Sequence, residues 1–227
     1  TVCEREQLWF HVDGAIGALL ALAPAHRHLV RGMERADSVT LDLHKWLHIP
    51  FEAACVLVRD RRAHREAFAL TPEYLEKTER GLASGALWFS EYGLQLSRGF
   101  RALKVWLSIK EHGLDRFGRL IDRNIAQAHE LAALVQAEPD LELLAPVATN
   151  IVCFRYNPGG LSDEQLNALN EELLIRLHES GIAAPSYTTL DGRYCLRAAI
   201  VNFRTTSADL PVLIGAVREI GTSLPRP

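Results

Sequence analysis

The sequence predicts an α/β protein in two parts: a portion of a large domain built on a parallel or mixed sheet, then a smaller α+β domain. Two observations predict this organisation. In the first part, short apolar runs alternate with helical segments, which is typical of a mainly parallel sheet. In the second part, strand-like runs flank an amphipathic helical segment. We place the boundary between residues 92 and 93, which predicts domains 1–92 and 93–227.

Three strands are predicted in the first part. All three runs are rich in apolar and β-branched side chains. They are residues 8–13, a run that starts at Ser38, and residues 51–58. Residues 15–22 and 26–35, which lie between these strands, are predicted to be helical. Three strands are too few to close a doubly wound core.

Residues 71–90 show no sustained apolar period, and we predict a mobile loop there, since a loop of this length is usually functional or disordered. Long helices are predicted over residues 94–112 and 114–137. The remaining predicted elements are strands at 141–144, 150–156 and 193–201, a helix capped by Ser162 and ended by Gly181, and a last helix after Ser207.

Charge and composition exclude several classes of partner. The formal net charge is −3 with no long basic run, so we expect no nucleic-acid partner. The longest apolar run, residues 15–25, is about half the roughly 20 residues that a membrane span requires, so we expect no membrane partner.

The cysteines and histidines show no metal-ligand spacing, so no metal is expected. The four cysteines are widely spaced, and we interpret them as buried free thiols in a reducing compartment. The absence of a signal peptide agrees with a cytoplasmic protein. The chain begins at Thr1 and enters folded-looking sequence at once, which suggests a piece of a longer protein.

Two residues at predicted strand ends carry the candidate chemistry. Asp13 and Lys45 follow apolar strands, and in open α/β sheets ligands bind at the carboxyl ends of the strands. A lysine and a carboxylate in one cleft suit a pyridoxal cofactor, since the lysine forms a Schiff base and the carboxylate keeps the pyridine nitrogen protonated. A structural ion pair, or two unrelated polar residues, explains the same spacing.

Five segments together resemble the group II pyridoxal-phosphate-dependent decarboxylases, which include the aromatic-L-amino-acid, histidine, glutamate and diaminobutyrate decarboxylases. The resemblance runs from about Leu8 to the end of the chain. The segments are His-Val-Asp-Gly-Ala at 11–15, Asp-Leu-His-Lys-Trp-Leu at 42–47, Pro-Glu-Tyr-Leu at 72–75, Ser-Arg-Gly-Phe-Arg-Ala-Leu-Lys-Val-Trp at 97–106 and Cys-Leu-Arg-Ala-Ala-Ile at 195–200.

The resemblance implies a fold-type I pyridoxal-phosphate-dependent transferase-like architecture. Residues 1–92 would then be the C-terminal part of the large cofactor-binding domain. In the family, the phosphate-binding serines or threonines and the ring-stacking histidine lie upstream of the first residue here, so we expect this chain to hold the second half of an active site. Family members are homodimers with a shared active site and are mainly cytosolic.

The resemblance also implies roles for individual residues. Lys45 would hold the cofactor as a Schiff base, Asp13 would pair with the pyridine nitrogen, and Ala15 would pack against the ring. His44 would lie beside the cofactor and assist with phosphate or proton handling. Tyr74 matches the tyrosine of the family's mobile loop, which protonates the substrate carbanion.

Two further positions follow from the resemblance. Phe51 matches a position that lines the substrate pocket in aromatic decarboxylases, although a core residue at a strand start is an equal alternative. Asp42 is often asparagine in animal members, near the phosphate. A carboxylate there would repel the phosphate unless screened, so Asp42 is left outside the predicted site.

The expected function is therefore pyridoxal-phosphate-dependent α-decarboxylation of an L-amino acid, aromatic or related, to an amine and carbon dioxide. An aldehyde synthase or a carbon–carbon lyase of the same fold is an alternative outcome. A truncated, non-catalytic partner that dimerises with a full-length relative is an alternative of a different class.

Overall fold

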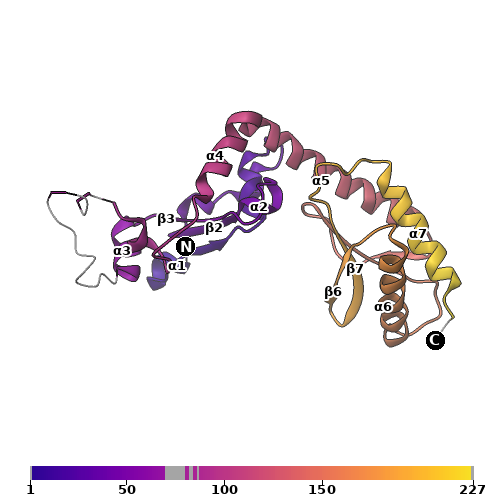
Figure 1. Ribbon diagram of the computed structural model, residues 1–227. Coiled ribbons are helices and arrows are strands. Elements are labelled where there is room, and N and C mark those ends of the chain that lie inside the picture. Colours follow the sequence, from indigo (N-terminus) through magenta and orange to yellow (C-terminus); the bar gives the residue numbers. More distant parts are fainter. Residues whose placement is uncertain (1, 70–79, 82–83, 86, 226–227) are drawn as a thin grey trace. The chain divides into compact units, whose positions relative to one another are not determined.

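The computed structural model describes residues 2–69, 80–81, 84–85 and 87–225. The chain divides into two compact units, Thr1–Phe117 and Gly118–Pro227, here called the N-terminal and C-terminal units (Figure 1). The sequence placed the boundary at residues 92 and 93 instead. The helix Arg101–His112 falls within the N-terminal unit, where the side chain of Arg101 bonds to Glu52.

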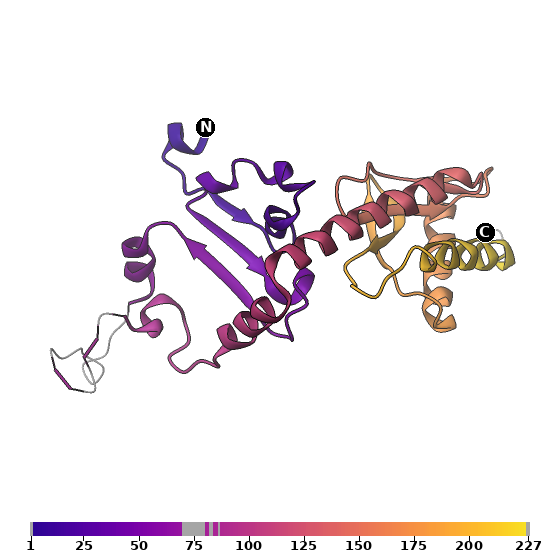
Figure 2. The ribbon, with the colours of Figure 1, turned by 90° about the horizontal axis from the view of Figure 1, so that it is seen from above.

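The sheet of the N-terminal unit is mixed. Within the described residues it has three strands in the order β1-β2-β3, and β1 pairs parallel with β2 while β3 runs antiparallel to it (Figure 2). The β2–β3 connection contains one helical turn, which is too short for the crossover that a parallel pair needs. The bounds are β1 His11–Asp13, β2 Ser38–Asp42, α2 Leu43–Trp46 and β3 Ala54–Val58.

The two helices predicted between the strands are short 3-10 helices rather than α-helices. Pro24 ends the first of them, and Gly32 interrupts the second with a φ of 101°, a left-handed conformation that favours glycine. The observed elements are η1 Gly17–Leu22, η2 Arg27–Val30 and η3 Met33–Arg35.

The last helix of the N-terminal unit begins later than the sequence predicts. The helix predicted from residue 94 begins at Arg101, after Gly93 and Gly99, which weaken helical backbone. Most of the predicted loop 71–90, Tyr74 included, lies outside the described residues. The remaining elements are α1 Val2–Glu6, α3 Arg61–Phe68, η5 Phe89–Tyr92 and α4 Arg101–His112.

The C-terminal unit is an antiparallel sheet packed with helices. Across residues 118–225 the sheet has four strands in the order β4-β5-β7-β6. The helix α5 has the predicted bounds, Leu114–Ala137. The other bounds are β4 Leu141–Leu143, β5 Ile151–Tyr156, α6 Asp163–Ser180, β6 Ser186–Leu190, β7 Arg193–Ala199 and α7 Asp209–Ser223.

The edge strand β6 was missed by the sequence prediction. Its residues are mostly exposed and polar, so no apolar alternation marks them. The signal that could have found it is the Asp191-Gly192 pair, where both residues have positive φ, 50° and 78°. A two-residue turn of this kind joins the strands of a tight hairpin.

The core of the C-terminal unit lies between its sheet and its helices. Phe154, Leu173 and Leu196 are fully buried there and come from β5, α6 and β7. The predicted cap of α6 is confirmed, since Ser162 and Gln165 form a reciprocal capping box. The buried side chain of Asn170 ties α6 to β5 through both the N–H and the carbonyl of Tyr156.

All four cysteines lie in the described part of the chain, and all four are free. Cys153 and Cys195 are buried, as predicted, whereas Cys3 and Cys55 are half-buried. Burial, together with the neighbouring Cys153, raises the pKa of the Cys195 thiol to about 11. This thiol is therefore protonated at neutral pH and is a poor nucleophile.

Candidate active site

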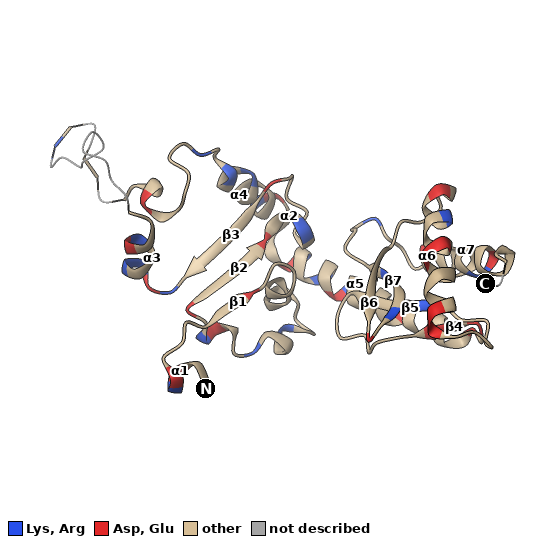
Figure 3. Ribbon diagram, turned by 90° about the horizontal axis from the view of Figure 1, so that it is seen from below, with Lys and Arg blue, Asp and Glu red and all other residues tan. Residues whose placement is uncertain are grey.

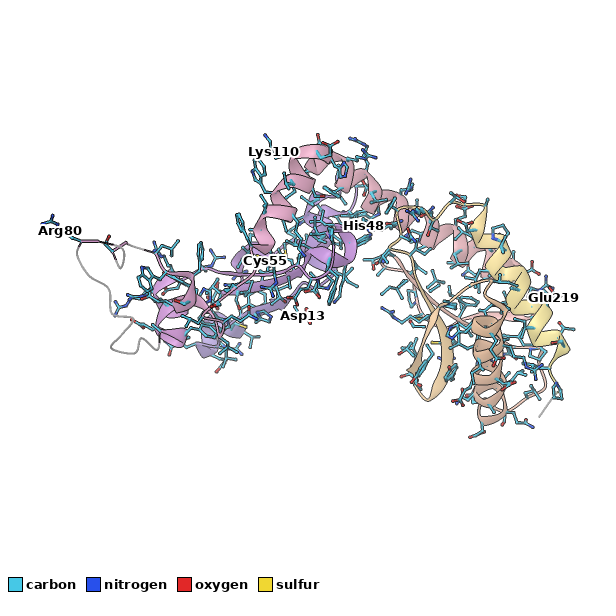
Figure 4. The ribbon with its side chains drawn as sticks, viewed as in Figure 1. Asp13, His48, Cys55, Arg80, Lys110 and Glu219 are labelled. Carbon is cyan, nitrogen blue, oxygen red and sulfur yellow. The ribbon has the colours of Figure 1, made fainter. Side chains whose placement is uncertain are left out.

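The parallel strands β1 and β2 end at the same edge of the sheet, and the candidate site lies there. β1 ends at Asp13 and β2 ends at Asp42, after which α2 begins at once (Figure 3). Figure 4 labels Asp13 on β1. The carboxyl ends of parallel strands are the usual ligand-binding edge of an open α/β sheet.

The carboxylate of Asp13 is held by two donors. Its Oδ1 accepts hydrogen bonds from the Ala15 N–H at 3.1 Å and from the Thr40 hydroxyl at 3.4 Å. Thr40 lies opposite Asp13 in the β1–β2 register. Gly14 makes the turn possible, because a Cβ at this position would lie 2.8 Å from the Thr40 carbonyl oxygen.

Lys45 lies on the single turn of α2, with its side chain 41% exposed. Its Nζ is 2.5 Å from Oδ2 of Asp42. The next residue, Trp46, is fully buried and anchors the turn to the unit. The lysine amine is therefore accessible but held in place.

A continuous set of contacts joins Asp13 to Lys45. The Ala15 N–H bonds to Asp13, and the Ala15 carbonyl accepts from the Asp42 N–H at 3.1 Å. Asp42 then pairs with Lys45. The structure thus brings together three residues that the sequence predicted, and it links them through Asp42, which the sequence prediction left outside the site.

His44 is fixed by Ala53, the residue that precedes β3. Its backbone N–H bonds to the Ala53 carbonyl at 3.1 Å, and its Nδ1 accepts from the Ala53 N–H at 3.2 Å. The ring of Phe51 contacts the His44 ring edge-on, with centroids 5.0 Å apart. Phe51 is 83% exposed, so the alternative of a core residue does not hold within the described chain.

An ion pair connects this region to α4. The guanidinium of Arg101 bonds to the carboxylate of Glu52, and this hydrogen bond lowers the pKa of Glu52 below its usual range. Glu52 lies between Phe51 and Ala53, the two residues that contact His44. The sequence does not reveal this ion pair, because residues 49 positions apart leave no local pattern.

Neither a metal-ligand cluster nor a membrane-spanning helix occurs among the residues that the structure describes. In that part of the chain, no group of three or more His, Cys, Asp or Glu residues could hold a metal ion. No helix within the same residues is long and apolar enough to cross a membrane. Tyr74 lies outside the described residues, so its place relative to Lys45 stays a prediction.

Comparison with known proteins identifies the family. Residues 1–157 match the pyridoxal-dependent decarboxylase conserved domain. The chain is 36% identical over 220 residues to an aromatic-L-amino-acid decarboxylase of Bacillus atrophaeus, covering 96% of this chain and 46% of that protein. It is 32% identical to a phenylacetaldehyde synthase of Arabidopsis thaliana, covering 88% of this chain and 40% of that protein.

A solved structure gives the same result for the fold. The crystal structure of Oryza sativa TDC with PLP and tryptamine superposes with a TM-score of 0.88 at 27% identity, covering 97% of this chain and 46% of that one. The chain therefore spans less than half the length of these relatives. It belongs to the pyridoxal-dependent decarboxylase family and has the fold of these α/β enzymes, as the sequence predicted.

The residues present fit the cofactor of this family, pyridoxal phosphate. The accessible amine of Lys45 suits the aldehyde of the cofactor, and the anchored carboxylate of Asp13 suits a protonated ring nitrogen. Both groups lie at the carboxyl edge of the sheet. The Asp42 carboxylate is an anion at the same edge, and its charge is compensated by Lys45.

Proposed function

We propose that this chain supplies the lysine-bearing half of an amino acid decarboxylase site, which converts an aromatic or related L-amino acid to an amine and carbon dioxide. The observation that carries the proposal is the set of contacts from Asp13 through Ala15 and Asp42 to Lys45. It places an amine and a fixed carboxylate at one sheet edge, as pyridoxal chemistry requires.

When bound, the cofactor accepts the electron pair that the departing carboxylate leaves behind. Lys45 holds the cofactor through its amine, and Asp13 keeps a proton at the ring nitrogen. Ala15, whose backbone bonds to Asp13 and Asp42, has a small side chain, which leaves room for a flat ring. His44, fixed through Ala53, orients its ring at the same edge.

The substrate class is proposed from the relatives and from one side chain. The Bacillus atrophaeus relative is an aromatic-L-amino-acid decarboxylase, and the Oryza sativa structure contains tryptamine. Phe51 offers an exposed aromatic surface beside His44, which suits an aromatic substrate side chain.

Tyr74 is proposed as the residue that returns a proton to the α-carbon after carbon dioxide leaves. The test replaces Tyr74 with phenylalanine in the full-length protein and measures amine and aldehyde products. We expect the variant to divert turnover toward aldehyde and ammonia. Normal amine production by the variant would remove this role from Tyr74.

An aldehyde synthase is the second candidate activity, because a phenylacetaldehyde synthase is among the relatives. The two activities differ in product, so the discriminating assay measures amine and aldehyde from the same reaction. The tyrosine at position 74 favours the amine.

A homodimer is proposed from the surface of α4. Leu103, Trp106 and Leu107 are 44%, 57% and 52% exposed, and their spacing places them on one face of the helix. An exposed apolar face of this kind marks an interface. Sedimentation of the wild type and of a Trp106→Glu variant tests the proposal, since the variant should favour the monomer.

The experiment that tests the main proposal maps the attachment of the cofactor. The protein is incubated with pyridoxal phosphate, reduced with borohydride, digested and analysed by mass spectrometry. We expect the label on the peptide that contains Lys45, and we expect its loss in Lys45→Ala. The matched control is Lys104→Ala on α4, which should keep the label.

The proposal fails if a folded protein, extended upstream as in the longer relatives, carries no label on Lys45. Label without decarboxylation by the extended protein would support the non-catalytic partner instead.

A further inference from the structure

We propose that Asp42 is a positioning residue for Lys45, which holds the lysine amine at the sheet edge whenever that amine is not bonded to the cofactor. The role in turnover rests on the proposed function, whereas the contact itself does not. The observation behind it is the ion pair between Lys45 Nζ and Asp42 Oδ2, 2.5 Å apart and one helical turn apart in sequence.

The conformation of Asp42 shows that its carboxylate is directed to the lysine rather than to the helix. Asp42 occupies the N-cap position of α2 with extended backbone, but its side chain makes no capping hydrogen bond. Asp60 occupies the same position of α3, and its side chain accepts from the N–H groups of Arg62 and Ala63. An aspartate at an N-cap ordinarily makes such bonds.

The backbone of Asp42 is fixed on both sides of the strand. Its N–H bonds to the Ala15 carbonyl at 3.1 Å, and the residue pairs with Ala54 of β3 in the sheet register. Its side chain is only 21% exposed. A carboxylate carried by such a rigid segment can hold a mobile lysine side chain in one place.

The consequence concerns both the cofactor-free chain and turnover. Before the cofactor binds, Asp42 keeps the Lys45 amine at the edge where Asp13 lies. When the amine of the substrate takes the place of lysine, the Asp42 carboxylate offers the released lysine amine a hydrogen-bond acceptor within reach.

The test measures the reactivity of the lysine without the cofactor. The chain is methylated with limiting formaldehyde and cyanoborohydride, and mass spectrometry gives the extent of labelling at Lys45 relative to Lys104 and Lys110. In Asp42→Asn we expect Lys45 labelling to rise about two- to five-fold, as for loss of a partly exposed ion pair. Asp42→Glu should restore labelling toward the wild-type value.

Two controls separate positioning from a change in folding. Asp60→Asn removes the corresponding aspartate of α3 and should leave Lys45 labelling unchanged. The ratio of Lys104 to Lys110 should be constant in every variant. If Asp42→Asn does not fold, Lys45 labelling of the wild type is measured at about 1 M salt instead. Salt screens the ion pair with Asp42, so labelling should rise.

Unchanged Lys45 labelling in a folded Asp42→Asn, or no effect of salt on the wild type, would overturn this proposal. The trapping experiment with pyridoxal phosphate is separate. If pyridoxal phosphate is not trapped on Lys45 but the methylation results are as expected, the proposed function is wrong and the contact between Asp42 and Lys45 is still supported.

Discussion

The two units differ in how they use their apolar side chains. In the C-terminal unit, Phe154 and Leu173 are fully buried between the sheet and the helices. In the N-terminal unit, Val56 and Leu57 of β3 are 47% and 56% exposed, although they belong to the sheet that carries the site. Among the described residues, the N-terminal unit, which holds the candidate site, therefore has the less complete hydrophobic core.

This difference shows that the best-packed core and the candidate site lie in different units of the chain. The C-terminal unit gathers its buried apolar side chains in one continuous core. The N-terminal unit instead positions Asp13 and Lys45 by strand ends, hydrogen bonds and one ion pair. Its exposed apolar surface marks it as a place for further contacts.

The largest expected effect tests the core of the C-terminal unit. Phe154→Ala should lower the free energy of unfolding of that unit by about 3–5 kcal/mol, because it removes a large, fully buried side chain. Leu57→Ala in the N-terminal unit should cost about 1 kcal/mol or less. Urea denaturation of both variants measures these changes. Equal losses in the free energy of unfolding would contradict the conclusion that the two units differ in the completeness of their cores.

The next effect tests a buried charge in the N-terminal unit. Arg65 donates two hydrogen bonds to Glu91, whose side chain is 6% exposed, so Arg65→Ala should lower the melting temperature by leaving this buried carboxylate without these donors. The exposed pair of Arg62 and Glu66 provides the control, and Arg62→Ala should cost about 0.5 kcal/mol or less. Thermal unfolding of the two variants provides the comparison. If Arg65→Ala and Arg62→Ala have similar melting temperatures, the bonds from Arg65 to Glu91 do not stabilise the unit more than an exposed ion pair does.

A pH dependence is expected for the C-terminal unit. Burial raises the pKa of the Glu142 carboxyl, but hydrogen bonds from Arg155 and Asn157 outweigh burial and lower the pKa below 4.5. Glu142 therefore stabilises the folded unit above its unfolded pKa, and this contribution is lost as the pH falls through the folded pKa. We expect the free energy of unfolding of this unit to fall as the carboxyl becomes protonated.

Glu142→Gln should flatten the acid side of the stability profile, measured by denaturation between about pH 3 and pH 7. Glu172→Gln, which alters an exposed pair with Arg176 on α6, should keep the wild-type profile. An unchanged profile in Glu142→Gln would assign the acid sensitivity to other carboxylates.

The smallest effect is expected at the site itself. Thr40→Val removes a hydroxyl that donates to Asp13 at 3.4 Å and keeps the shape of the side chain, so stability should change by about 0.5 kcal/mol or less. Cofactor release, followed by absorbance, should nevertheless become faster, since Asp13 loses a donor. Thr189→Val on the exposed edge strand β6 should change neither quantity.

Local patterns allowed several features to be predicted from the sequence alone. The bounds of α5 and the cap of α6 followed from apolar period and from Ser162, because these interactions join residues within one or two turns. The strand that ends at Asp13 was also recognised from local sequence. The motifs around Asp13 and Lys45 were sufficient, with the three other matching segments, to indicate the family.

Only the tertiary structure decided the direction of β3, the pairing of β6 and the partners of the site residues. Arg101 pairs with Glu52, which is 49 positions away, and no local pattern selects one such partner among many. Asp42 and Lys45 are near in sequence, yet an aspartate that precedes a helical turn is as compatible with a cap as with an ion pair. The backbone contacts of Asp42 with Ala15 and with β3 decided between them, because they fix the strand end and direct its carboxylate to the lysine.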